Sequence, residues 1–182
     1  MITSLPFIIS ELERSISALA PDQRFRVIFF QRNDAILVPG PSDSSPPALP
    51  ARLLAASASN REFVSSWIQL DRNNIRAQGR SNPVAALSLA LSNLDPAPDL
   101  IFLLSSDITG VGEFEISQAD LLKTIDRLNR NPDGSRKAVI RTIQFLDADP
   151  LETLRKIAQR NGGPDGYRFV DRAALDAFEE SR

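Results

Sequence analysis

The stretch Leu100-Ile-Phe-Leu-Leu-Ser-Ser-Asp107 decides the fold of this chain. A short run of apolar residues is typical of a parallel strand that is buried on both faces. Two hydroxyls and a carboxylate follow the run directly, so the strand would deliver oxygen atoms at its carboxyl end. Open α/β sheets place their binding sites at that edge, and Ser and Asp oxygens suit Mg²⁺ or Mn²⁺. The stretch therefore predicts a parallel strand beside a candidate site.

Amphipathic and apolar segments alternate on both sides of this strand. Further apolar runs predict strands, and the short connection between the first two of them implies an antiparallel hairpin. Helices that alternate with buried strands predict an α/β fold, a three-layer, doubly wound, mostly parallel sheet with an antiparallel edge strand. The predicted helices lie at 6–19, 60–70, 84–94, 121–128, 150–160 and 173–180, and the other predicted strands lie at 25–30, 35–38, 138–146 and 167–170.

The chain length fits a single domain over residues 1–182 with a sizeable core. Residues 39–50 hold five prolines and three serines. We interpret them as a Pro/Ser-rich surface loop, because too little chain precedes them for a domain boundary. Phe63, Val64 and Trp67 have helical spacing, which favours core packing over a ligand platform.

Composition excludes several kinds of site. The net charge of −2 and the scattered basic residues give no reason to expect nucleic acid. The chain contains no cysteine and no histidine, which excludes thiolate nucleophiles, imidazole bases and zinc held by His or Cys, so oxygen atoms must hold any metal. No apolar run approaches the roughly 20 residues that span a bilayer, and no signal peptide is recognisable. We expect a soluble chain without membrane contact, cytoplasmic by default.

Several segments together resemble the von Willebrand factor type A (vWA) domain family. They are the loop Gly79-Arg-Ser-Asn-Pro83 and the strand that ends at Asp107, together with the segments 21–30, 142–145, 154–163 and 167–170. The resemblance covers almost the whole chain. It implies the vWA fold, with the antiparallel hairpin at one edge of the sheet.

The family's metal-ion-dependent adhesion site draws on three loops, and two of them have counterparts here. Ser81 falls on the threonine of the second loop, and Asp107 falls on the aspartate of the third, where Ile108 replaces the usual glycine. The resemblance thus implies Ser81 and Asp107 as ligands of Mg²⁺ or Mn²⁺. The competing interpretation is that Asp107 caps the strand end while Ser105 and Ser106 bond the backbone in turns.

The first and richest loop, Asp-x-Ser-x-Ser, would lie just upstream of Met1, together with the family's first strand. In the family that strand lies between the strands that correspond here to 25–30 and 100–104. Those two strands must then pair with each other, take a partner from elsewhere, or leave backbone groups unpaired at about 1–3 kcal/mol each. We therefore expect a truncated domain whose open edge is a template for an added strand.

The resemblance implies a non-enzymatic protein-interaction module of the adhesion type, with an incomplete metal site and a protein partner. One alternative is a Mg²⁺-dependent phosphoester hydrolase built on the Asp107 crevice, and another is a non-functional fragment of a larger vWA protein. Ser106 is a poor candidate nucleophile because the chain has no histidine to activate it. The absence of His, Cys and paired carboxylates favours the interaction module. The residues do not name its partner or its oligomeric state.

Overall fold

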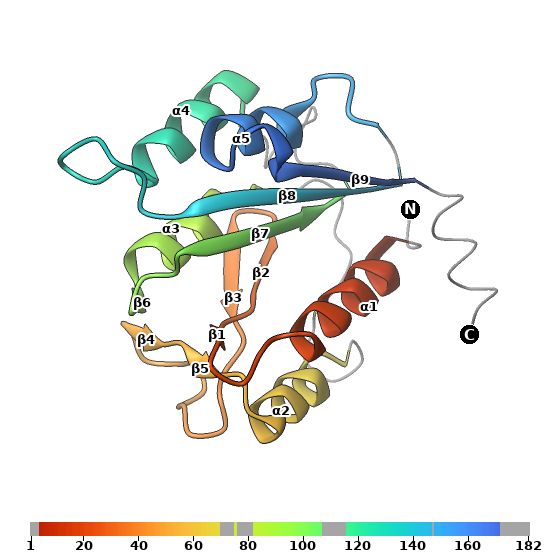
Figure 1. The fold of residues 1–182 in the computed structure, drawn as a ribbon, viewed down its shortest axis with the longest axis vertical. Helices are drawn as coiled ribbons and strands as arrows, with labels where there is room; N and C mark the ends of the chain where they lie inside the picture. The colour runs from red at the N-terminus through yellow and green to blue at the C-terminus, as the bar shows by residue number, and fades with distance from the viewer. Residues whose placement is uncertain (1–3, 70–74, 76–81, 107–115, 147, 172–182) are drawn as a thin grey trace.

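The helices and strands follow the predicted alternation along the chain (Figure 1). The computed structural model describes residues 4–69, 75, 82–106, 116–146 and 148–171, so the predicted helix at 173–180 lies outside the described residues. The elements are α1 (Ser4–Ser17), β1 (Arg24–Phe25), β2 (Ile28–Gln31), β3 (Asp34–Leu37), β4 (Ala51–Arg52), β5 (Leu54–Ala55), α2 (Ala58–Ile68), α3 (Val84–Ser92), β6 (Leu94–Asp95), β7 (Leu100–Ser105), α4 (Gln118–Leu128), β8 (Val139–Leu146), α5 (Thr153–Asn161), the 3-10 turn η1 (Pro164–Gly166) and β9 (Tyr167–Asp171).

Hydrogen bonds divide the strands into separate sheets. Strands β7, β8 and β9 form a parallel sheet in that order, and β2 and β3 form the predicted antiparallel hairpin. Two short pairs, β1 with β5 and β4 with β6, complete the set. Within the described ranges β2 pairs only with β3 and β7 pairs only with β8, so the strands predicted at 25–30 and 100–104 do not pair with each other.

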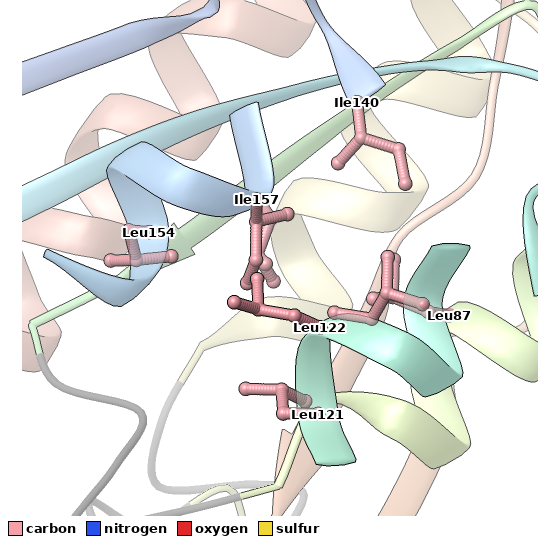
Figure 2. Close-up of a cluster of buried hydrophobic side chains, with 8 residues drawn as sticks. Leu87, Leu121, Leu122, Ile140, Leu154 and Ile157 are labelled. Atoms are coloured by element: carbon pink, nitrogen blue, oxygen red, sulfur yellow. The ribbon is translucent and has the colours of Figure 1, made fainter. Parts of the chain in front are cut away.

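The parallel sheet is covered by helices on both faces. On one face, residues of α3, α4 and α5 pack with Ile140 of β8 into a core that Figure 2 shows, comprising Leu87, Leu103, Leu121, Leu122, Ile125, Ile140, Leu154 and Ile157. On the other face, Phe7 and Ile8 of α1 pack against Ile143 and Phe145 of β8. This arrangement is the predicted three-layer α/β architecture.

The hairpin side has a core of its own, to which α1 and α2 contribute. Figure 1 shows both helices on that side of the molecule. Ile16 of α1 and Val64 of α2 are buried there with Val38, and Trp67 packs against them as predicted. Arg61 fastens the two helices together, because its Nη1 donates to the carbonyl oxygens at the end of α1, Ser17 at 2.8 Å and Leu19 at 3.3 Å. Those carbonyls lack helical partners, so the guanidinium satisfies them.

Capping side chains set where helices begin. Ser117 accepts a hydrogen bond from the amide of Asp120 at 3.1 Å and starts α4. The predicted start of the fifth helix at Pro150 is wrong by three residues, since α5 begins at Thr153. The carboxylate of Asp149 accepts the Thr153 amide at 2.7 Å, so residues 150–152 form a turn before the helix.

Two predictions about strands are corrected. The strand predicted at 25–30 is divided into β1 and β2, which bond to different partners. The prediction that the run at 100–104 is buried on both faces is wrong, because Leu100 is 41% exposed and Phe102 is 52% exposed. Both point to the same face of β7, an edge strand that has no hydrogen-bonded neighbour beyond it in the described chain. None of the helices in the described ranges combines the length and hydrophobicity that crossing a bilayer requires.

Candidate functional site

The carboxyl edge of the parallel sheet is where the sequence predicts a site. Ser105 is buried at the end of β7, and Ser106 is half-buried directly after it. The two predicted metal ligands, Ser81 and Asp107, lie outside the described residues. The neighbouring residue, Asn82, is described, and its backbone N–H donates to the carbonyl oxygen of Arg32 at 2.7 Å. Asn82 therefore lies against the turn of the β2–β3 hairpin.

A divalent cation needs several oxygen ligands, with carboxylates foremost among them. In the part of the chain that the structure describes, no three acidic side chains gather closely enough to hold one. The described residues by themselves therefore do not fit Mg²⁺ or Mn²⁺. Metal binding stays a prediction that rests on Ser81 and Asp107.

The best-defined feature at this edge is the loop of residues 148–153, which joins β8 to α5 and is called here the β8–α5 loop. Asp149 organises it from within: its carboxylate accepts the amides of Leu151 at 2.8 Å and Thr153 at 2.7 Å, and its carbonyl accepts the amide of Glu152 at 2.9 Å. Gln118 of α4 holds it from outside, donating to the carbonyl oxygen of Leu151 at 2.6 Å. The loop is therefore fixed both to itself and to a neighbouring helix.

Two residues, one before this loop and one within it, have left-handed backbone conformations. Leu146, the last residue of β8, has φ of 70°, and Glu152 has φ of 52°. Non-glycine residues in this region cost about 1–3 kcal/mol each and persist where the surroundings hold them in place. Leu151 lies between them and is 52% exposed. The surrounding hydrogen bonds thus hold a strained loop that presents an apolar side chain to solvent.

Polar side chains behind the loop are engaged with one another. Gln118 also donates to the Thr153 hydroxyl at 3.0 Å and accepts from the Lys156 ammonium at 3.2 Å. The Arg155 guanidinium lies 4.8 Å from the centre of the Tyr167 ring, and burial raises the pKa of that phenol above its usual value. These contacts support the loop from behind.

Sequence reasoning missed the β8–α5 loop because its apolar spacing resembles the start of a helix. The signal that could have found it is Asp149 before Pro150, since an Asp before a proline favours a turn. The exposure of Leu151 could not be predicted from the sequence, because that exposure depends on where α4 packs.

Comparison with known proteins supports the fold. The sequence matches no protein-family model and no curated protein. A solved structure described as von Willebrand factor type A from Catenulispora acidiphila superposes with a TM-score of 0.64 at 20% sequence identity, over 98% of this chain. The chain spans 38% of the length of that protein. Together with the parallel sheet between helical layers, this likeness shows that the chain has the fold of a von Willebrand factor type A domain.

Proposed function

We propose that this chain is a non-enzymatic protein-interaction module that binds a protein partner at the carboxyl edge of its parallel sheet. The observation that carries the proposal is Leu151, which is exposed on a loop that is strained, internally hydrogen-bonded and attached to α4. A rigid loop loses little conformational entropy when a partner docks on it. Ligands of open α/β sheets also bind at this edge.

The expected contribution of Leu151 follows from its exposed area. Burying a leucine side chain completely is worth about 1.5–3 kcal/mol, and about half of this side chain is still available to a partner. A partner that buries the remaining half of this side chain would lose that contribution when Leu151 is replaced by a charged residue. Ser81 and Asp107 would add oxygen ligands for Mg²⁺, as the resemblance implies.

The test compares two exposed leucines. The purified chain is immobilised, and proteins that it retains from extracts of its own cells are crosslinked to it. A protein whose crosslinks map to residues 148–156 is identified as the partner. Binding of the purified partner is then titrated against the unmodified chain, Leu151→Asp and the control Leu49→Asp, whose leucine is 51% exposed in the Pro/Ser-rich loop. We expect Leu151→Asp to weaken binding about tenfold or more and Leu49→Asp to leave it unchanged.

Equal effects of the two variants, or crosslinks confined to other surfaces, would refute the proposed binding edge. Repeating the titration with Mg²⁺, and with Asp107→Ala, tests the metal separately. Binding that Mg²⁺ strengthens in the unmodified chain but not in Asp107→Ala supports a working metal site. Binding that does not respond to Mg²⁺ rejects the metal and leaves the loop proposal standing.

A further inference from the structure

The basic residues look scattered along the sequence, but the structure gathers several of them along the outer side of α4. Lys123 and Arg127 are four residues apart on this helix, so their exposed side chains lie on the same side of it, one turn apart. Together with Asp120 and Thr124 they line an open depression of about 260 Å³. Figure 1 shows α4 on the outside of the molecule, with the loop that follows it projecting to the left. A positive surface therefore faces solvent along this helix.

The positive surface continues into that loop. The Asn129 amide donates to the carbonyl oxygen of Ile125 at 2.9 Å, so the last helical turn carries the chain up to Arg130. Arg136 is the antiparallel bridge partner of Arg130, and residues paired in this way have their side chains on the same face. Both residues are exposed, and Nη1 of Arg130 donates to the neutral carbonyl of Gly134 at 3.0 Å. We call four residues together the basic stripe: Lys123, Arg127, Arg130 and Arg136.

The charges of the basic stripe are not balanced by their surroundings. Residues 123–141 include six basic and two acidic residues, so this segment carries a charge of +4, whereas the whole chain carries −2. Of the two acidic residues, Asp126 is paired with Arg160 of α5 at 2.9 Å, and Asp133 accepts hydrogen bonds from Ser135. Among the residues that the structure describes, no ion pair includes a member of the basic stripe.

Holding these cations together costs stability rather than adding to it. Like charges four residues apart on a helix are destabilising, and so are like charges directly opposite each other across two strands. Lys123 with Arg127 is the first arrangement, and Arg130 with Arg136 is the second. The core does not need them, because α4 packs through its opposite side, where Ile125 is completely buried. An anionic ligand would remove the repulsion.

The composition around the basic stripe indicates which kind of anion it fits. No aromatic residue occurs from Gln118 to Arg141, so this segment offers no ring on which a nucleic-acid base could stack. Leu121, Leu122 and Ile125 of α4 are buried in the core, which leaves no broad apolar face to insert among lipids. Arginine guanidinium groups bind carboxylates through paired hydrogen bonds. These features favour the side chains of an acidic polypeptide.

We infer that the basic stripe binds an extended acidic segment of a partner protein, whose Glu and Asp carboxylates pair with Arg127, Arg130 and Arg136. From Lys123 to Arg130 the stripe covers about 10 Å along the helix, and the bridge to Arg136 adds about 5 Å. An extended segment of about five residues has this length, with side chains of one face about 7 Å apart. The stripe ends before β8 begins, whereas the β8–α5 loop follows the end of β8, so the inference does not rest on the proposed function.

The test titrates the full chain into a fluorescent synthetic peptide and follows fluorescence anisotropy. The peptide contains about five alternating Glu and Asp residues, to match the length of the basic stripe, and the control peptide has Gln and Asn in their places. We expect the acidic peptide alone to bind, with an affinity that falls as salt is raised. In the double variant Arg127→Gln with Arg136→Gln, the affinity should fall about tenfold or more.

A matched double variant controls for the loss of net charge. Arg24→Gln with Arg52→Gln removes two exposed arginines outside the basic stripe and should change the affinity less than about twofold. Charge reversal sharpens the test: Arg127→Glu with Arg136→Glu should abolish binding of the acidic peptide and create binding of a lysine peptide of the same length. Equal losses in the two Gln variants would show attraction to overall charge and refute the stripe, and so would an acidic peptide that does not bind.

Two further measurements separate the other interpretations. Tighter binding of an oligothymidylate, or of vesicles that contain phosphatidylserine, would overturn the assignment of a protein partner. Because the side chains of the stripe are exposed and like charges oppose each other, Arg127→Gln with Arg136→Gln should leave the unfolding temperature unchanged or raise it. A lowered unfolding temperature would assign these arginines to the stability of the fold and reject the inference.

Discussion

The parallel-sheet side and the hairpin side of the molecule are stabilised in different ways. On the parallel-sheet side, β8 runs through the centre of a core, and Ile140 and Phe145 are almost completely buried. On the hairpin side every residue of β2 is half-buried. The buried Arg26 side chain, just before β2, forms an ion pair with Asp43, whose side chain is 27% exposed. The parallel sheet depends on apolar packing, whereas the hairpin depends in addition on a polar contact with the Pro/Ser-rich loop. Substitutions on the two sides should therefore differ in how much they lower the free energy of unfolding and in how that loss depends on pH.

The largest effect is expected on the parallel-sheet side. Ile140→Ala removes a fully buried side chain from the core shown in Figure 2 and leaves a cavity. We expect the free energy of unfolding to fall by about 2–5 kcal/mol, measured by chemical denaturation. The control is Val139→Ala, next to it on β8 but 39% exposed, for which less than about 1 kcal/mol is expected. Equal losses of stability would mean that burial does not distinguish these two neighbouring positions of β8.

An intermediate, pH-dependent effect is expected on the hairpin side. The Arg26 side chain is 1% exposed, and its Nε and Nη1 atoms find no hydrogen-bond partner among the described residues, so its charge relies on Asp43. Burial works to raise the pKa of Asp43, but the Gly40 amide and the Arg26 guanidinium outweigh burial and lower the pKa. A carboxyl with a lowered pKa stabilises the fold above the unfolded value, near pH 4, and this stability is lost as pH falls through the folded value.

We therefore expect Asp43→Asn to lower the free energy of unfolding by about 1–3 kcal/mol at pH 7. The difference from the unmodified chain should shrink as pH falls below about 4 and disappear below the lowered pKa of folded Asp43, where this carboxyl is neutral in both the folded and the unfolded state. Denaturation measured at several pH values checks this, with Asp22→Asn at an exposed position as the control. A difference that stays constant down to pH 2 would show that the charge of Asp43 is unimportant.

Much of the fold could be predicted from the sequence, because long periodic segments carry their own signal. The helices around Val64 and Ile125 and the strand around Ile140 lie where their apolar spacing places them. The two-residue strands β4, β5 and β6 were missed, since a period cannot be recognised in so few residues. The start of α5 was wrong because one hydrogen-bonded carboxylate, that of Asp149, outweighs helical spacing.

The candidate site could be predicted only as a location. The carboxyl edge of the sheet followed from the strand before Asp107, but the β8–α5 loop depends on a contact from α4, which lies far away in the sequence. The exposure of Leu100 and Phe102 could not be predicted for a related reason. An apolar run looks the same whether or not a second strand covers it, so hydrophobicity alone cannot distinguish a central strand from an edge strand.

The smallest effect is expected at Phe102, an exposed residue of β7 on the parallel-sheet side. Because this side chain is half exposed, Phe102→Ala should change the free energy of unfolding of the chain alone by about 1 kcal/mol or less. Phe145→Ala, on the neighbouring strand and 1% exposed, should cost about 3–5 kcal/mol. A large loss at Phe102 in the chain alone would mean that another segment already covers it. A small loss would confirm that apolar residues of the same parallel sheet differ in their contribution to stability according to burial.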